Sequence, residues 1–293
     1  MKKAAVYLCI IASISGCSVD FNPTIDKASE CIVINSLLQP DSLITVRLYA
    51  AVVEDRGMKT IPLQNAYVIL KENQVVIFEG VVDSVLNLNI YPKTGALYSI
   101  EAIHAGYSQV HAETSIPTPI YCKVDCDEER IIDLYEFDIP DNRVPLWITA
   151  SALFTDTDPL QFAELYCNNL LVDNFNREEG SDIVNKQVGS GYHESFLRIK
   201  TENQIRLETI QFLPMLNRSI LWENFSGIEI RLIAASKEYD QYCKTYYQLL
   251  DIPISDDISA ILYQPVHVYS NIIGGLGIFA GKSDIGYFFE ETN

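Results

Sequence analysis

Apolar and polar residues alternate with a period of two along much of this chain, and this pattern predicts half-buried β-strands rather than helices. In the first 120 residues several such segments follow one another at short intervals, and polar turns separate them. Two pairs of neighbouring segments are close enough to predict hairpins, 66–70 with 75–78 and 98–103 with 109–116. The segments in this part of the chain are 31–38, 44–50, 66–70, 75–78, 98–103 and 109–116.

Strand-like segments continue in the second half of the chain, and one segment has a helical period. The expected strands are 146–154, 162–172, 196–200, 205–212 and 228–234, and the polar stretch 173–195 is expected to be an exposed excursion. Ser236 is a suitable N-cap for a helix that Pro253 ends. Apolar residues recur along this helix at Tyr239, Cys243, Tyr246 and Leu250, at helical spacing.

These patterns predict a mainly β protein with two domains. The first is expected to be an immunoglobulin-like β-sandwich, and the second a β-rich C-terminal domain with one short helix. The chain has 293 residues, enough for two domains of ordinary size. The expected divisions are a signal peptide over 1–17, a tether over 18–29, the sandwich over 30–120, a linker over 121–143 and the second domain over 144–293.

The first residues have the order of a bacterial lipoprotein signal peptide. Lys2 and Lys3 precede an apolar run over 4–14, small residues follow, and Cys17 supplies the thiol that would carry the lipid. The run is shorter than the roughly 20 apolar residues that span a bilayer. An ordinary secretory peptide or a buried first strand is the alternative interpretation. Two or three acyl chains on Cys17 would hold the protein durably on a membrane.

The net charge narrows the expected partners, and the cysteine spacing narrows the expected disulfide and metal sites. The formal net charge is −18, or −20 without Lys2 and Lys3, and so acidic a surface repels phosphate backbones, so no nucleic-acid partner is expected. Five cysteines remain beyond the signal, and the spacing of Cys122 and Cys126 could allow a small disulfide loop. No zinc site is expected from this spacing.

Few residue patterns suggest chemistry. Asp156 and Asp158 could bind structural calcium, although their turn-forming role before a proline is the simpler interpretation. Pairs of acids in the same region leave a glycan- or peptide-degrading hydrolase open as an alternative function.

The run from Gly275 to Ala280 matches G-x-G-x-x-A but lacks the βαβ context of a nucleotide site, so its glycines are expected to allow close backbone approach. No cofactor and no catalytic residue is assigned. The helical tyrosines, Tyr239, Tyr242 and Tyr246, are candidate contacts for a ligand or partner, or else an aromatic core stripe.

Several motifs in order along the chain resemble the Bacteroidota lipoproteins grouped as domain of unknown function 4249. Residues 31–38 resemble the family's apolar V-V-N-G-L-L opening, although Ser36 stands where glycine is common. Residues 65–68 resemble its N-A-x-V strand. Residues 154–159 resemble its F-x-D-P opening of the second domain, with Thr157 splitting the Asp-Pro pair. Residues 268–272 running into 274–279 are the most specific match.

This resemblance implies a location and a partner more than a chemistry. Such lipoproteins are similar in setting to those that accompany TonB-dependent outer-membrane transporters. The first domain also resembles the transthyretin-like sandwiches found on such transporters. The expected function is therefore a non-catalytic accessory or nutrient-binding lipoprotein of the outer membrane, with a peptide or glycan as ligand. Ser18 after the cysteine also favours the outer membrane, without deciding between its periplasmic and external faces. A structural or adhesion module of the envelope is a further alternative.

Overall fold

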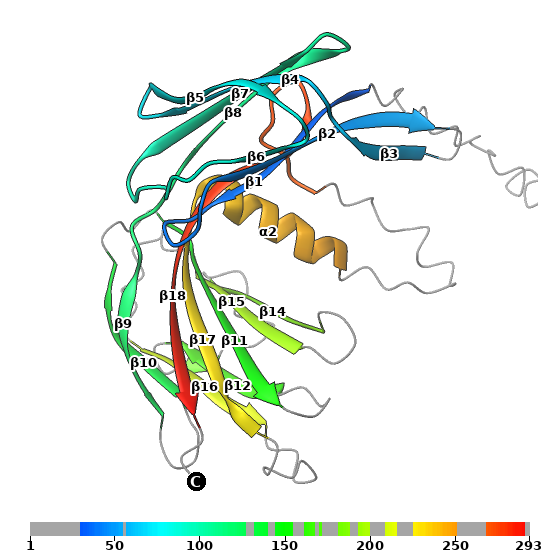
Figure 1. The fold of residues 1–293 in the computed structure, drawn as a ribbon. Helices are drawn as coiled ribbons and strands as arrows, with labels where there is room; N and C mark the ends of the chain where they lie inside the picture. Colours follow the sequence, from blue (N-terminus) through cyan, green and yellow to red (C-terminus); the bar gives the residue numbers. More distant parts are fainter. Residues whose placement is uncertain are drawn as a thin grey trace, which may run out of the picture.

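The expected strands form three sheets in a computed structural model of the chain (Figure 1). The chain is mainly β with one 14-residue helix among the described residues, which confirms the expected class, while the immunoglobulin-like or transthyretin-like sandwich type stays a prediction. All structural statements below concern the residues that the structure describes, which are 30–54, 57–126, 132–139, 144–154, 161–167, 170–171, 181–187, 193–199, 209–215, 225–250 and 268–290.

The largest sheet has nine strands and extends through both halves of the molecule. Its order is β14 (Ser181–Gln187), β15 (His193–Ile199), β11 (Leu146–Phe154), β17 (Phe225–Ala235), β18 (Leu276–Glu290), β1 (Cys31–Leu38), β2 (Thr45–Glu54) and β3 (Gly57–Pro62), and β6 (Val85–Asn87) also pairs with β2.

Two smaller sheets complete the fold. The four-stranded sheet has the order β5 (Val75–Val82), β4 (Ala66–Glu72), β7 (Leu97–His104) and β8 (Tyr107–Ser115). Antiparallel pairing of β4 with β5 and of β7 with β8 confirms both expected hairpins. The five-stranded sheet has the order β13 (Leu170–Leu171), β12 (Gln161–Cys167), β16 (Thr209–Met215), β10 (Ile132–Asp138) and β9 (Tyr121–Cys126).

Strand β18 joins the two halves of the nine-stranded sheet. Its first part, Leu276 to Gly281, pairs in parallel with β1, in the register Asn35 to Ile278. Its second part, Lys282 to Glu290, pairs antiparallel with β17. Figure 1 shows this strand in red, running from the β1 layer down along β17. A segment from the end of the chain therefore lies beside the first strand that the structure describes.

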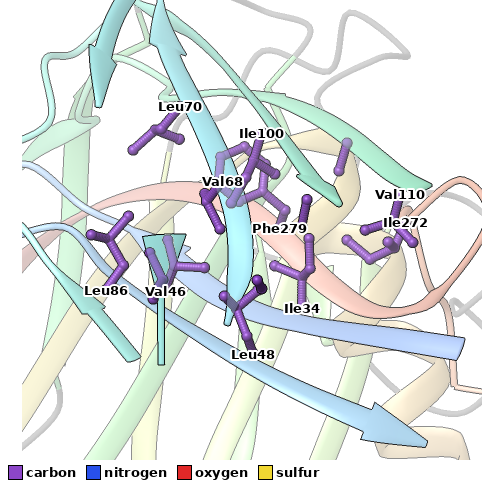
Figure 2. Close-up of a cluster of buried hydrophobic side chains, with 14 of the residues drawn as sticks. Ile34, Val46, Leu48, Val68, Leu70, Leu86, Ile100, Val110, Ile272 and Phe279 are labelled. Atoms are coloured by element: carbon purple, nitrogen blue, oxygen red, sulfur yellow. The ribbon is translucent and has the colours of Figure 1, made fainter. Parts of the chain in front are cut away.

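The first hydrophobic core lies between the four-stranded sheet and the β18–β1–β2 part of the nine-stranded sheet. Alternating residues of β1 and β2 point into it, among them Ile34, Val46 and Leu48, and Val68 and Ile100 meet them from the opposite sheet. Figure 2 shows these side chains converging, together with Ile272 and Phe279 from the end of the chain. Phe279 has no exposed surface. The core of the first 120 residues is thus completed by residues near position 280.

A second core lies between the five-stranded sheet and the lower half of the nine-stranded sheet. It contains Ile132 and Leu134 of β10, Ile148 of β11 and Ile230 and Leu232 of β17. These β10 residues come from the segment 121–143, which was expected to be a linker but contains the paired strands β9 and β10. The expected excursion over 173–195 likewise contains β14, which pairs with β15.

Glycines and one amide bring β18 close to its neighbours. Gly277 has a φ of 104°, and a Cβ atom there would overlap the backbone carbonyl oxygen of Ile34. The side-chain amide of Asn271 donates from Nδ2 to the Phe279 carbonyl oxygen at 2.7 Å, and its Oδ1 accepts from the Phe279 N–H at 3.0 Å. The expected close backbone approach of the glycine-rich run is confirmed.

Candidate functional site

A hollow lies on the face of β18, β1 and β2 that points away from the first core. Because successive side chains of a strand point to opposite faces, Asn35, Leu37 and Arg47 point outward while Ile34 and Leu48 point inward. The hollow has a volume of about 420 Å³. Its described lining residues are Asn35, Ser36, Leu37, Thr45, Arg47, Tyr239, Tyr242 and Ile278.

The floor of the hollow is a row of residues across three strands. Asn35 is directly paired with Ile278 on its parallel side and with Arg47 on its antiparallel side. In the strand pairs Cβ atoms lie about 4.5–5.5 Å apart, so this row presents an aliphatic, an amide and a guanidinium group side by side. Thr45 continues the floor, where its hydroxyl donates to Asn87 Oδ1 at 3.0 Å.

The wall of the hollow is helix α2 (Lys237–Leu250), which confirms the helix expected after Ser236. Figure 1 shows α2 on the opposite side of β1 and β2 from the four-stranded sheet. Ser236 caps the helix, because its Oγ accepts from the Tyr239 N–H at 3.2 Å. Its own N–H donates to the carbonyl oxygen of Gly281 at 2.9 Å, which ties the start of the helix to β18.

A buried hydrogen bond fixes α2 against the nine-stranded sheet. The Trp147 Nε1–H donates to Asp240 Oδ1 at 2.9 Å, and both residues are almost fully buried. Cys243 and Ile233 pack beside them, and Tyr239 and Tyr242 border the same cluster. The wall of the hollow is therefore held by the core of the second half, while the floor belongs to the sheet over the first core.

The tyrosines expected as ligand or partner contacts have different positions. Tyr239 and Tyr242 line the hollow. Tyr246 is 39% exposed and stacks on Tyr242, with ring centroids 5.9 Å apart and an interplanar angle of 9°. Burial, with smaller effects of Tyr246 and Cys243, raises the pKa of Tyr242, so its hydroxyl is a neutral hydrogen-bonding group at physiological pH.

Arg47 gives the hollow its charge. Among the described residues that line the hollow it is the one cation, and no described carboxylate lies within ion-pairing distance of it. Arg231, the other arginine whose side chain is described, contacts Glu229 and Asp284 instead. Arg47 is thus available to a ligand that carries negative charge.

The described thiols are poor nucleophiles. Burial raises the pKa of Cys243 to about 12 and that of Cys122 to about 11, and it also raises the pKa of Cys31, so all three stay protonated near neutral pH. The Cys122–Cys126 disulfide loop that the spacing left open is not formed, because both residues lie in the continuous strand β9. Four residues of extended strand span about 13 Å, far beyond the Cα separation of a disulfide.

Other expected site residues lie outside the described residues or form no cluster. Cys17, Asp156 and Asp158 are in the first group. In the described part of the chain, no three histidine, cysteine or acidic side chains are close enough to hold a metal ion. No helix in that part is both long and apolar enough to cross a bilayer.

The sequence predicts the tyrosines that form the aromatic wall of the hollow, but it does not predict the residues of its floor. The alternation over 44–50 placed Arg47 and Thr45 on a polar face, but a polar face is common to most half-buried strands. The signal that would identify them is the pairing of β1 with β18, which brings Ile278 and α2 to that face. No local pattern reports a contact between residues so far apart in the sequence.

Comparisons with known proteins identify a family without a described activity. The model of the family described as Domain of unknown function (DUF4249) matches residues 19–284. No curated protein matches the chain. One similar solved structure is the crystal structure of the collagen binding domain of Erysipelothrix rhusiopathiae surface protein RspB, with 8% sequence identity and a TM-score of 0.21 over 87% of this chain and 97% of that one. A similarity this low carries no argument about function.

Proposed function

The chain belongs to the family described as Domain of unknown function (DUF4249), and from this premise we propose that it is a binding protein for a small nutrient. The hollow between α2 and the β18–β1–β2 face is its binding site. In this proposal a lipid on Cys17 holds the protein at the outer membrane, where it serves a TonB-dependent transporter.

The observation that carries the proposal is the composition of the hollow. An aromatic wall from Tyr239 and Tyr242 faces a floor with an amide, a hydroxyl and an unpaired guanidinium group. Ligand sites combine apolar and aromatic lining with a few polar groups that orient the ligand, in volumes of roughly 300–1,000 Å³. The hollow of about 420 Å³ has this composition and this size.

Rigidity of the lining supports the proposal further. The wall is fixed by the Ser236 cap and by the hydrogen bond between Trp147 and Asp240, and the floor is fixed by the sheet pairing on both sides of Asn35. A site whose groups are already held in place loses less conformational entropy on binding. The order of residues from Lys2 to Cys17 supports the lipid anchor.

Ligand capture tests the binding role directly. The chain from residue 18 onward is immobilised and exposed to a mixture of protein-digest peptides and polysaccharide-hydrolysate oligosaccharides, and retained compounds are identified by mass spectrometry. The double variant Tyr239→Leu/Tyr242→Leu should retain at least one compound about tenfold less than the unchanged chain, because it lacks both rings and hydroxyls.

Tyr67→Leu is the matched control, since Tyr67 is a partly exposed tyrosine of β4 in the four-stranded sheet, away from the hollow. Its retention profile should equal that of the unchanged chain. Equal profiles for the unchanged chain and the double variant would contradict a binding site at the hollow.

Membrane anchoring and the transporter partnership need a cellular measurement. In the source bacterium, the variant Cys17→Ser should move from the membrane fraction to the soluble fraction or the medium, because no acyl chain can attach without the thiol. Deletion of this gene and deletion of a neighbouring transporter gene should impair uptake of a shared nutrient. Membrane retention of Cys17→Ser would exclude the anchor, and uptake defects that never overlap would exclude the partnership.

A further inference from the structure

We propose that the ligand of the hollow is a small carboxylic acid, whose carboxylate pairs with Arg47 while a ring of the same molecule lies against Tyr239 and Tyr242. This inference rests on the proposed binding function and specifies the chemical class of the ligand. Two sources share this chemistry: a short peptide with an aromatic C-terminal residue, and an oligosaccharide with a uronic acid.

The positive charge of Arg47 on the floor of the hollow favours a negatively charged ligand. Arg47 carries a guanidinium cation and has no ion-pair partner among the described side chains. A cationic ligand would be repelled there, and a neutral ligand would partly desolvate the guanidinium without providing a counter-charge. A carboxylate accepts two parallel hydrogen bonds from a guanidinium group, which is the strongest arrangement available to this side chain.

Neighbours of Arg47 fit the remaining polar atoms of such a ligand. The cross-strand partner Asn35 brings amide groups that both donate and accept, and Thr45 adds a hydroxyl on the same floor. These groups suit the peptide or hydroxyl groups that adjoin a carboxylate in either source. Ile278, on the other side of Asn35, supplies an apolar contact.

The wall fits a ring. Tyr242 stacks on Tyr246, so one face of the Tyr242 ring is already occupied, and this stacking restrains its orientation toward the hollow. Aromatic rings pack well in offset or edge-to-face contact, and the apolar face of a sugar ring packs on them similarly. The volume of about 420 Å³ allows a ligand of dipeptide or disaccharide size.

The acidic character of the whole chain does not prevent this binding. The formal net charge is −18, which slows the approach of an anion at low ionic strength. At physiological ionic strength the Debye length is about 8 Å, so the groups within the hollow determine the affinity. We therefore expect affinity for a carboxylate that depends on Arg47 and weakens at high salt.

Titration calorimetry with four defined probes tests the ligand class. The probes are N-acetyl-alanyl-phenylalanine, its neutral C-terminal amide, digalacturonic acid and the neutral dimethyl ester of digalacturonic acid. At least one acid should bind at least about tenfold more tightly than its neutral counterpart, because the charge-assisted pair is lost in the neutral probe. The pair that shows this difference identifies the source of the carboxylate.

Arg47→Gln should weaken binding of that acid by about tenfold or more and leave the weak binding of its neutral counterpart unchanged. Arg47→Lys should retain part of the preference, because it keeps the charge without the planar fork. Lys59→Gln is the matched control, since Lys59 is an exposed cation of β3 that does not line the hollow. Thermal unfolding of each variant checks that the fold is kept.

Two results separate failure of this inference from failure of the proposed function. If the capture experiment shows loss in Tyr239→Leu/Tyr242→Leu but no acid is preferred over its neutral counterpart, the carboxylate class is wrong and the binding role stands. If an acid is preferred but Arg47→Gln binds it unchanged, the assignment of Arg47 is wrong. If Tyr239→Leu/Tyr242→Leu retains every compound as well as the unchanged chain does, both the proposed binding function and the carboxylate class are wrong.

Discussion

Replacement of Gly277 by alanine is expected to destabilise the protein by about 3 kcal/mol or more, a large part of the roughly 5–15 kcal/mol typical of natural domains. Two effects add at this position. The φ of 104° is a conformation that residues with a side chain rarely adopt, and the new Cβ would overlap the Ile34 carbonyl oxygen. It would also lie 2.9 Å from Asn35 Oδ1. Neither backbone can move without breaking the pairing of β1 with β18.

Gly286→Ala is the control on the same strand. The nearest atom to a Cβ at position 286 is Glu229 Oε1 at 3.7 Å, which is the end of a flexible side chain. Its effect should stay within about 1 kcal/mol. Urea unfolding followed by circular dichroism measures both variants, and an equal m-value is needed for the comparison. A Gly277→Ala chain as stable as the Gly286→Ala chain would show that β18 does not approach β1 as closely as described.

Deletion of residues 271–293 is expected to abolish cooperative unfolding of both halves of the molecule. The deletion removes Phe279, whose truncation in a well-packed core costs about 3–5 kcal/mol, and Ile272 from the same core. It also removes the strand that pairs with β1 and β17, and the Gly281 carbonyl oxygen that accepts from the Ser236 N–H. These losses together exceed the usual stability of a domain.

Deletion of residues 291–293, which lie beyond β18, is the control and should leave the urea transition unchanged. A synthetic peptide of residues 268–290, added to the longer deletion, should restore a cooperative transition in a concentration-dependent way. The same logic applies to a fragment of residues 30–120, which should fold in the presence of this peptide and not in its absence. A 30–120 fragment that unfolds cooperatively by itself would contradict the expectation.

Local sequence patterns predict the strands and the helix whose formation depends on residues close together in the sequence. Alternation identified β1, β2 and the two hairpins, because each has one face in a core and one outside it. The helix was visible from its cap at Ser236 and from its periodic apolar residues. The glycine-rich run predicts a close approach to another backbone because glycine has no Cβ atom, and this prediction does not require the neighbouring strand to be known.

Elements that depend on distant partners could not be predicted. The pairing of β1 with β18 joins Val33 to Leu276, and no period or motif within either segment reports it. Acidic residues around Ile132 and Leu134 give the segment 121–143 the pattern of a linker, although both apolar residues are fully buried in the second core. For the candidate site, the tyrosines of α2 were recognisable, whereas the role of Arg47 depends on which surface lies opposite it.

The parallel pairing of β1 with β18 also determines how late in biosynthesis the nine-stranded sheet can form. A ribosome adds about 5–20 residues per second, so the roughly 240 residues between these partners take about 12–50 s to make. During this interval the nascent chain has β1 but lacks the neighbour that completes its sheet, and premature folding is disfavoured. For a polypeptide proposed to leave the cytoplasm, this delay favours passage through a translocation channel in the unfolded state, with the nine-stranded sheet completed only after β18 has emerged.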